Sequence, residues 1–156
     1  MHEEDFRVYK SKDLLDPSHK NLITQAMEAS ASSYSPYSNY QVGAALMLGN
    51  GQVITGSNQE NASYPAGLCA ERVALFHTAS VLPDEKIMAL ATVAKRRADT
   101  HFRPVSPCGI CRQVIVEYEL KQNSPIQVIL QSPNGDWIVT DNAKMLLPFC
   151  FDKESL

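Results

Sequence analysis

The stretch that decides the fold is VGAALMLGNGQVITG, residues 42–56. Residues 42–48 form an apolar run rich in small side chains, and residues 52–56 have the pattern of a returning strand. Between them, Asn50-Gly51 is a dipeptide that adopts the positive φ angles of a tight two-residue turn. We therefore predict a β-hairpin in this part of the chain.

Helical and strand patterns alternate on both sides of the hairpin. Asp16-Pro17 is typical of a helix start, and Asp141 is placed to cap a short last helix ending near Leu147. A hairpin followed by alternating strands and helices predicts an α/β domain with a mixed sheet covered by helices. By pattern, we expect further helices over about 16–31, 68–80 and 108–118, and further strands over 87–94, 126–130 and 137–140.

The length and composition predict one domain over residues 1–156, with residues 1–15 as an N-terminal arm in which Phe6 to Tyr9 alternates like a short strand. The formal charge of -3 gives no general attraction to nucleic acid and favours a small substrate. The basic residues of 95–97 and Arg103 are interpreted as a solvated connector.

The chain has no apolar run of the roughly 20 residues that span a membrane, and its acidic start lacks the basic region of a signal peptide. We therefore expect a cytoplasmic protein without a membrane partner. In that compartment the four cysteines stay reduced, so their grouping indicates metal binding or catalysis before disulfides.

Three of the cysteines lie at two predicted helix starts. Cys108 and Cys111 are three residues apart, on one helix face, where two thiolates can bind one Zn²⁺ ion. Cys69 adds a third thiolate, and a three-ligand site leaves the fourth tetrahedral position open to water, as in catalytic zinc sites. A closed structural site needs a fourth ligand, and the candidates His77, His101 and Cys150 are poorly placed along the chain.

Glu71 follows Cys69 by two residues, which on a regular helix separates the side chains by about 200°. Both reach one ion only if the ion lies beyond the helix tip, with Cys69 as a ligand and Glu71 as an acid/base beside the metal-bound hydroxide. Three thiolates leave the centre at net -1, so Arg72 is expected to donate to a thiolate as an outer-sphere partner, with Arg112 and Gln113 as weaker candidates. The pattern Cys-x-Glu followed by Pro-Cys-x-x-Cys is typical of nucleobase deaminases.

The sequence resembles the cytidine deaminase family of the small, homotetrameric type. The resemblance implies a three-layer α/β/α fold with a five-stranded mixed sheet, a zinc cofactor, and hydrolysis of cytidine and 2'-deoxycytidine in pyrimidine salvage. The segments that carry the resemblance are residues 33–45, 56–65, 68–72, 106–113 and 146–148.

By the same resemblance, Asn58 and Glu60 would bind ribose hydroxyls, and Tyr40 would stack on the base where the family usually has Phe. Ala70, through its backbone, would read the cytosine edge together with Glu71. Phe151 would reach into a neighbouring subunit's site in a homotetramer.

Three other functions fit parts of the sequence. A deaminase of a cytosine-containing antibiotic such as blasticidin S shares the zinc pattern, but the pair Asn58 and Glu60 favours a ribose. A polynucleotide deaminase needs a basic or aromatic groove, which the acidic balance disfavours. A non-enzymatic zinc module would be four-coordinate and would not need Glu71.

Overall fold

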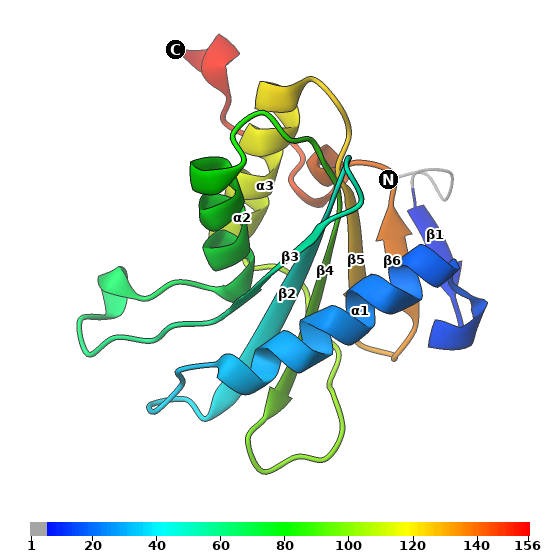
Figure 1. Cartoon of the computed structure of the whole chain (residues 1–156), viewed down its shortest axis with the longest axis vertical. Coiled ribbons are helices and arrows are strands. Elements are labelled where there is room, and N and C mark those ends of the chain that lie inside the picture. The colour runs from blue at the N-terminus through cyan, green and yellow to red at the C-terminus, as the bar shows by residue number, and fades with distance from the viewer. Residues whose placement is uncertain (1–5) are drawn as a thin grey trace.

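The computed structural model describes residues 6–156 and contains a mixed sheet of six strands, in the order β1-β6-β5-β4-β2-β3 (Figure 1). Strands β4 and β5 pair in parallel, and the other neighbouring pairs are antiparallel. The strands are β1 (Phe6–Tyr9), β2 (Tyr40–Leu48), β3 (Val53–Ser57), β4 (Ile87–Arg96), β5 (Gln127–Gln131) and β6 (Trp137–Thr140).

Helices cover both faces of this sheet: α1 (Pro17–Ala29) lies on one face, and α2 (Ala70–Val81) and α3 (Gly109–Gln122) lie on the other (Figure 1). Each face has its own buried apolar cluster. Leu22 of α1 belongs to one cluster, and Leu75 of α2 belongs to the other. The prediction of an α/β fold with a mixed sheet covered by helices is therefore confirmed.

The prediction of five strands is wrong, because β1 adds a sixth strand. It pairs antiparallel with β6, from Phe6 opposite Thr140 to Tyr9 opposite Trp137. The alternating pattern of residues 6–9 indicated a strand, but it did not place that strand in the sheet. Without β1, strand β6 would present its unpaired backbone groups at the sheet edge, and covering such an edge removes a site of unwanted pairing.

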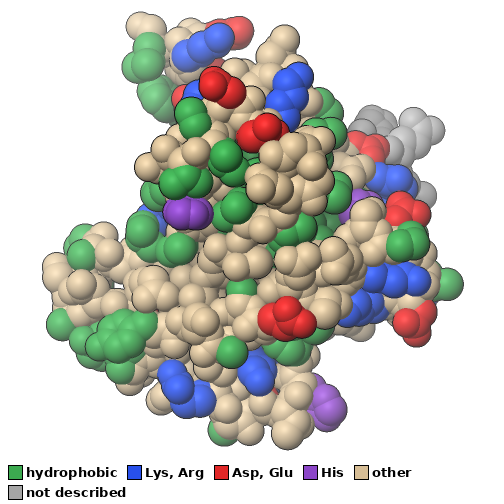
Figure 2. All heavy atoms as spheres, viewed as in Figure 1, with side chains coloured by type: hydrophobic (Ala, Val, Ile, Leu, Met, Phe, Trp, Pro, Cys, Tyr) green, Lys and Arg blue, Asp and Glu red, His purple; other side chains and the backbone are tan. Residues whose placement is uncertain are grey.

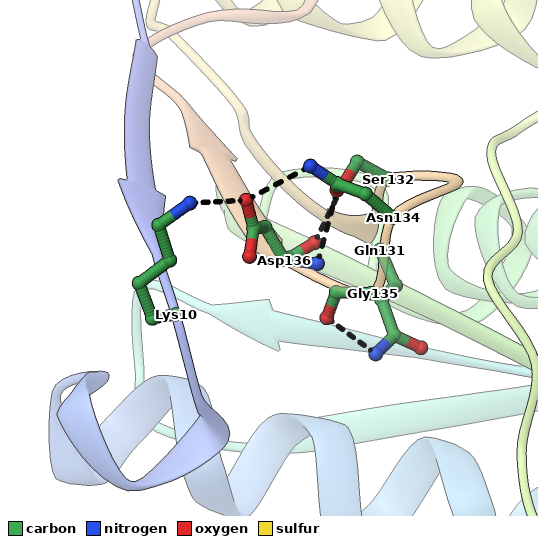
Figure 3. A network of polar contacts seen from close by, with 6 residues as sticks. All are labelled: Lys10, Gln131, Ser132, Asn134, Gly135 and Asp136. Atoms are coloured by element: carbon green, nitrogen blue, oxygen red, sulfur yellow. Dashed lines mark hydrogen bonds and ion pairs between the residues drawn. The ribbon is translucent and has the colours of Figure 1, made fainter.

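Polar contacts fasten the end of β1 to the turn between β5 and β6 (Figure 3). Lys10, just after β1, donates to the Asp136 carboxylate over 2.8 Å, and Asn134 donates to the same carboxylate over 3.2 Å. Within the turn, Gln131 donates to the Gly135 carbonyl over 2.8 Å. An exposed ion pair such as Lys10–Asp136 is worth less than about 1 kcal/mol, so the strand ladder carries most of the attachment.

Two predicted local features differ from the structure. The hairpin of β2 and β3 forms, but residues 49–52 join the strands and only Gly51 has a positive φ, of 85°. The last helix is a 3-10 turn, η4 (Ala143–Leu146), and Asn142 caps it through a bond from the Met145 amide. Asp141, the predicted cap, instead pairs with Arg7 over 3.1 Å, a contact that exists only because β1 lies beside β6.

A glycine in β3 sets the position of the helix that begins with Ala70. A Cβ atom on Gly56 would lie 2.5 Å from the Ala70 carbonyl oxygen and 2.7 Å from the Ala74 amide nitrogen. Only glycine permits this approach of helix backbone to strand. Gly56 therefore fixes how far the first turn of α2 lies above the sheet.

No helix within residues 6–156 is both long enough and apolar enough to span a membrane.

Candidate metal centre and substrate cleft

Two helix N-termini bring three thiols together. Cys69 is the N-cap residue of α2, Cys108 is the N-cap residue of α3, and Cys111 lies in the first turn of α3. The Sγ atoms of Cys69 and Cys108 are 3.8 Å apart, and those of Cys108 and Cys111 are 3.5 Å apart. The contact between residues 69 and 108 spans 39 positions of sequence, so the fold creates it.

The spacing of the three sulfurs fits a tetrahedral metal ion. A zinc–sulfur bond of about 2.3 Å and a tetrahedral angle put two sulfur ligands about 3.8 Å apart. All three sulfurs here lie within 4.8 Å of one another, and among the metal-binding side chains of residues 6–156 they form a single cluster. Cys150 is outside it and packs against the apolar cluster under α2 and α3. The donor set therefore suits a metal ion with three protein ligands.

The surroundings shift the pKa values of two of the thiols in opposite directions. The pKa of Cys69 is lowered to about 5. A hydrogen bond with Cys111 is the largest cause and one from Arg72 adds to it, although burial opposes the shift. The contact with Cys69 and burial together raise the pKa of Cys111. Arg72 Nη2 lies 3.8 Å from the Cys69 sulfur. Arg72 and the N-terminus of α2 favour the thiolate form of Cys69, which is the form that binds metal.

The two weaker candidates for thiolate donors have different partners. The Arg112 guanidinium donates to the carbonyl oxygens of Pro107 and Leu146, each over 2.9 Å. The Gln113 amide donates to the Phe151 carbonyl over 2.8 Å. Neither side chain is hydrogen-bonded to a sulfur among the described contacts.

Glu71 is a buried carboxyl group beside the thiols. It lies in the first turn of α2, two residues after Cys69, and its residue is 3% exposed. Burial raises its pKa, and the negative charge of Cys69 adds to the effect. A carboxyl group whose pKa is raised by burial holds its proton more readily than an exposed one, which suits acid/base work.

These groups meet in a cleft of about 660 Å³, a volume typical of small-molecule sites. The cleft runs from the thiols to two polar residues that follow β3, so that these groups share one space. Its lining includes Asn58, Glu60, Cys69, Glu71, Arg72 and Cys108.

Asn58 is almost fully engaged by the protein. Its side-chain oxygen accepts from the Val42 amide over 2.9 Å and from the Ser33 hydroxyl, and its amide donates to the Tyr40 carbonyl over 2.9 Å. An asparagine amide has two N–H groups, so one is left to meet a ligand in the cleft. Asn58 therefore both shapes the start of β2 and faces the cleft.

Glu60 is held by a loop that the sequence did not single out as a functional element. Its carboxylate accepts from the Tyr37 amide over 2.9 Å, from the Ser38 amide over 3.3 Å, and from the Ser38 hydroxyl. The Ser38 hydroxyl, with the two amides, lowers the pKa of Glu60. Ser38 belongs to the segment 33–45 that carries the resemblance, which is the signal that could have pointed to it.

Three of the predicted substrate-binding residues are not part of the cleft lining. Tyr40 is half-buried at the start of β2, Ala70 is fully buried, and Phe151 is 60% exposed near the C-terminus.

The predicted basic connector is exposed at Arg96, Arg97 and Arg103. Figure 2 shows Lys and Arg side chains at the lower end of the molecule, where β4 ends.

Comparison with known proteins identifies the family. A family model described as the cytidine and deoxycytidylate deaminase zinc-binding region matches residues 16–124. A cytidine deaminase of Halalkalibacterium halodurans is 42% identical over 135 residues, which cover 86% of this chain and 95% of the relative. The chain belongs to the cytidine deaminase family.

Solved structures of cytidine deaminases have the same fold. The enzyme from Burkholderia pseudomallei superimposes with a TM-score of 0.71 at 42% identity, covering 85% of this chain and 98% of that one. The enzyme from Mycobacterium tuberculosis gives a TM-score of 0.69 at 32% identity, covering 88% and 99%. Membership of the family makes this chain an enzyme, and the resemblance identified from its sequence segments is confirmed.

Proposed function

We propose that this protein deaminates cytidine and 2'-deoxycytidine by hydrolysis, releasing uridine or 2'-deoxyuridine and ammonia, in pyrimidine salvage. The observation that carries the proposal is the buried carboxyl of Glu71 beside three thiols at the end of a nucleoside-sized cleft. Because thiol ligands stay reduced in the cytosol, we place the reaction there.

Cys69, Cys108 and Cys111 would hold Zn²⁺, since the sulfur spacing fits its bond lengths and the family model is that of a zinc-binding region. When bound, the ion makes a coordinated water acidic enough to supply hydroxide at neutral pH. Arg72 and the two helix N-termini would offset the charge of three thiolates.

Glu71 would move the protons. Its carboxylate takes one proton from the attacking water and delivers it to the N3 ring nitrogen of cytosine. It then takes the second proton from the hydroxyl now on C4 and gives it to the 4-amino group, which leaves as ammonia as the C4 carbonyl forms. The raised pKa of Glu71 matches this task, because the group must be both a base and an acid in one turnover. Its burial also excludes bulk water from the transfer.

Substrate recognition would rest on the polar end of the cleft. The free N–H of Asn58 would donate to a ribose hydroxyl and the carboxylate of Glu60 would accept from one. Tyr40 would contact the base, and the backbone at Ala70 would bind its polar edge. Phe151 is exposed, and we propose that it contacts a neighbouring subunit's site in a homotetramer.

The test is the loss of cytidine absorbance on incubation with the purified, zinc-loaded protein. Deoxycytidine, blasticidin S and a short single-stranded oligonucleotide are run in parallel. Rapid turnover of both nucleosides supports the proposal. Turnover of blasticidin S or the oligonucleotide alone would replace it with the corresponding activity, and zinc-loaded protein inactive on all four would favour a structural zinc module.

A further inference from the structure

Arg112 occupies a position that the proposed chemistry does not use. It follows Cys111 directly on α3, and its half-buried side chain is hydrogen-bonded to two backbone carbonyls. Nε donates to the Pro107 carbonyl and Nη1 donates to the Leu146 carbonyl, both over 2.9 Å. One side chain therefore joins the residue before Cys108 to the last residue of η4.

The Pro107 carbonyl depends on this contact. Within residues 6–156, it accepts a hydrogen bond from Arg112 and from no other recorded donor, and proline has no N–H of its own. Pro107 is buried, whereas Cys108 is the most exposed of the three thiol residues. The donor is charged, which makes the bond stronger than one between neutral groups.

Open space lies next to the loop at Ser106, the residue before Pro107. A cavity of about 310 Å³ lies beside it, and Ser106, Arg112, Leu146 and Phe6 contribute to its walls. Ser106 also lines the catalytic cleft, so this residue borders both spaces. The hydrogen bond to the neighbouring Pro107 carbonyl is therefore a contact that can hold this end of the loop in place.

Gln113 makes a second attachment from the same turn of α3. Its side chain donates to the Phe151 carbonyl over 2.8 Å, five residues beyond Leu146. Phe149, between the two attachment points, is exposed and has a positive φ of 58°. The helix that carries two of the thiols is thus also the anchor of the C-terminal segment 146–151.

We propose that Arg112 is a positioning residue, which fixes Cys108 for metal binding by bonding the metal-binding loop to the C-terminal segment. The inference rests on the proposed function only in that the three thiols must bind zinc. Outer-sphere residues that orient metal ligands change metal affinity by about 10-fold to 100-fold when they are replaced. We expect an effect of that size on zinc retention for Arg112→Gln.

The experiment measures the rate of zinc transfer from the full-length protein to a chromophoric chelator. Arg112→Gln removes the charge and both bonds, while Arg112→Lys keeps the charge with a single donor group and should release zinc at an intermediate rate. Gln113→Leu frees Phe151 but leaves Pro107 held, so its release rate should stay near that of the unchanged protein. Arg7→Gln is the matched control. Arg7 also makes a polar contact, but its partner is the exposed Asp141 and not the metal-binding loop.

Unfolding midpoints measured on the same zinc-loaded samples separate positioning from general stability. Faster zinc release from Arg112→Gln than from Arg7→Gln and Gln113→Leu supports the proposal. Release within twofold of the unchanged protein would overturn it, even if the midpoint falls. If Arg112→Gln does not fold, the lysine variant decides by the same criterion. If the unchanged protein binds no zinc, the proposed function fails instead, and that outcome is visible before any variant is compared.

Discussion

Glu71 is the residue on which the proposed chemistry depends most. Glu71→Gln keeps the size of the side chain but cannot accept a proton, so we expect turnover of cytidine to fall by at least about 10²-fold to 10⁴-fold. Zinc content should be unchanged, because Glu71 is not among the clustered thiol ligands. Steady-state kinetics and metal analysis on the same preparation check both statements.

Glu117→Gln is the matched control for Glu71→Gln, since Glu117 is exposed on α3. A Glu71→Gln protein that binds zinc and turns over cytidine at the rate of the control would remove Glu71 from the acid/base role.

Ser38 should set the acid limit of substrate binding through Glu60. The Ser38 hydroxyl, with the loop amides, keeps the pKa of Glu60 below its usual value, so the carboxylate stays ionised as the pH falls. In Ser38→Ala the pKa of Glu60 should rise toward the ordinary value. The increase in KM for cytidine at low pH should then begin at a higher pH than in the unchanged protein.

The pH profile of KM, measured alongside Ser80→Ala as an exposed serine control, tests this effect. Superimposable acid limbs for the two variants would contradict the role of Glu60 in binding. A fall in kcat without a shift of the limb would place Ser38 elsewhere in the reaction.

At the scale of single residues, the sequence pointed to those site side chains that lie within a few residues of one another along the chain. Cys108 and Cys111 lie one turn apart, and Cys69 and Glu71 share a helix start, so their grouping is readable along the chain. Ser38 was not singled out because its contact with Glu60 crosses 22 residues and joins two loops. No local pattern encodes such a contact.

Among the elements, the contact of β3 with α2 is sensitive to side-chain size. In Gly56→Ala the new methyl group would overlap backbone atoms of Ala70 and Ala74, which cannot rotate away. We expect a loss of about 1–3 kcal/mol in the free energy of unfolding and a displaced first turn of α2, with weaker zinc binding as a result. Denaturant unfolding and zinc titration measure the two effects.

Gly49→Ala is the control for this substitution, because a Cβ atom there would have its nearest neighbours at 3.7 Å. Equal stability of the two variants would show that α2 adjusts freely over the sheet, and Gly56 would lose its positioning role.

Hydrophobic patterning predicted the helices and the interior strands because each buries an apolar face. Strand β1 was harder to place, since four residues with two exposed side chains carry little pattern and their partner, β6, lies more than 120 residues away. The exact form of the hairpin turn was not predicted either. Asn50-Gly51 marked its position, but residues 49–52 join the two strands.

For the whole molecule, the proposed homotetramer makes a prediction about shared sites. If Phe151 of one subunit completes the site of another, Phe151→Ala and Glu71→Gln proteins are each impaired. Co-refolding equal amounts should create sites with an intact Glu71 and a neighbour's intact Phe151, up to about a quarter of the total for random mixing. Cytidine turnover before and after mixing, with light scattering for subunit number, measures this recovery.

Mixing without any gain in activity would mean that Phe151 acts within its own subunit or not at all. Phe149 and Phe151 present large apolar side chains to solvent close together in sequence, and the proposed subunit contact would cover apolar surface there. Sequence patterning alone did not mark these residues as a surface, since a short apolar run after a proline is equally typical of a buried segment.

The contact of Cys69 with Cys108 across 39 positions of sequence would give a bound metal ion a second role, that of a cross-link. An ion held by thiols of both helices closes a long loop, as a disulfide would. Closing a loop of that length restricts the unfolded chain by an amount equivalent to about 4 kcal/mol. Removing the metal with a chelator would therefore destabilise the fold as well as stop catalysis. The metal-free protein should be the form that proteases degrade first.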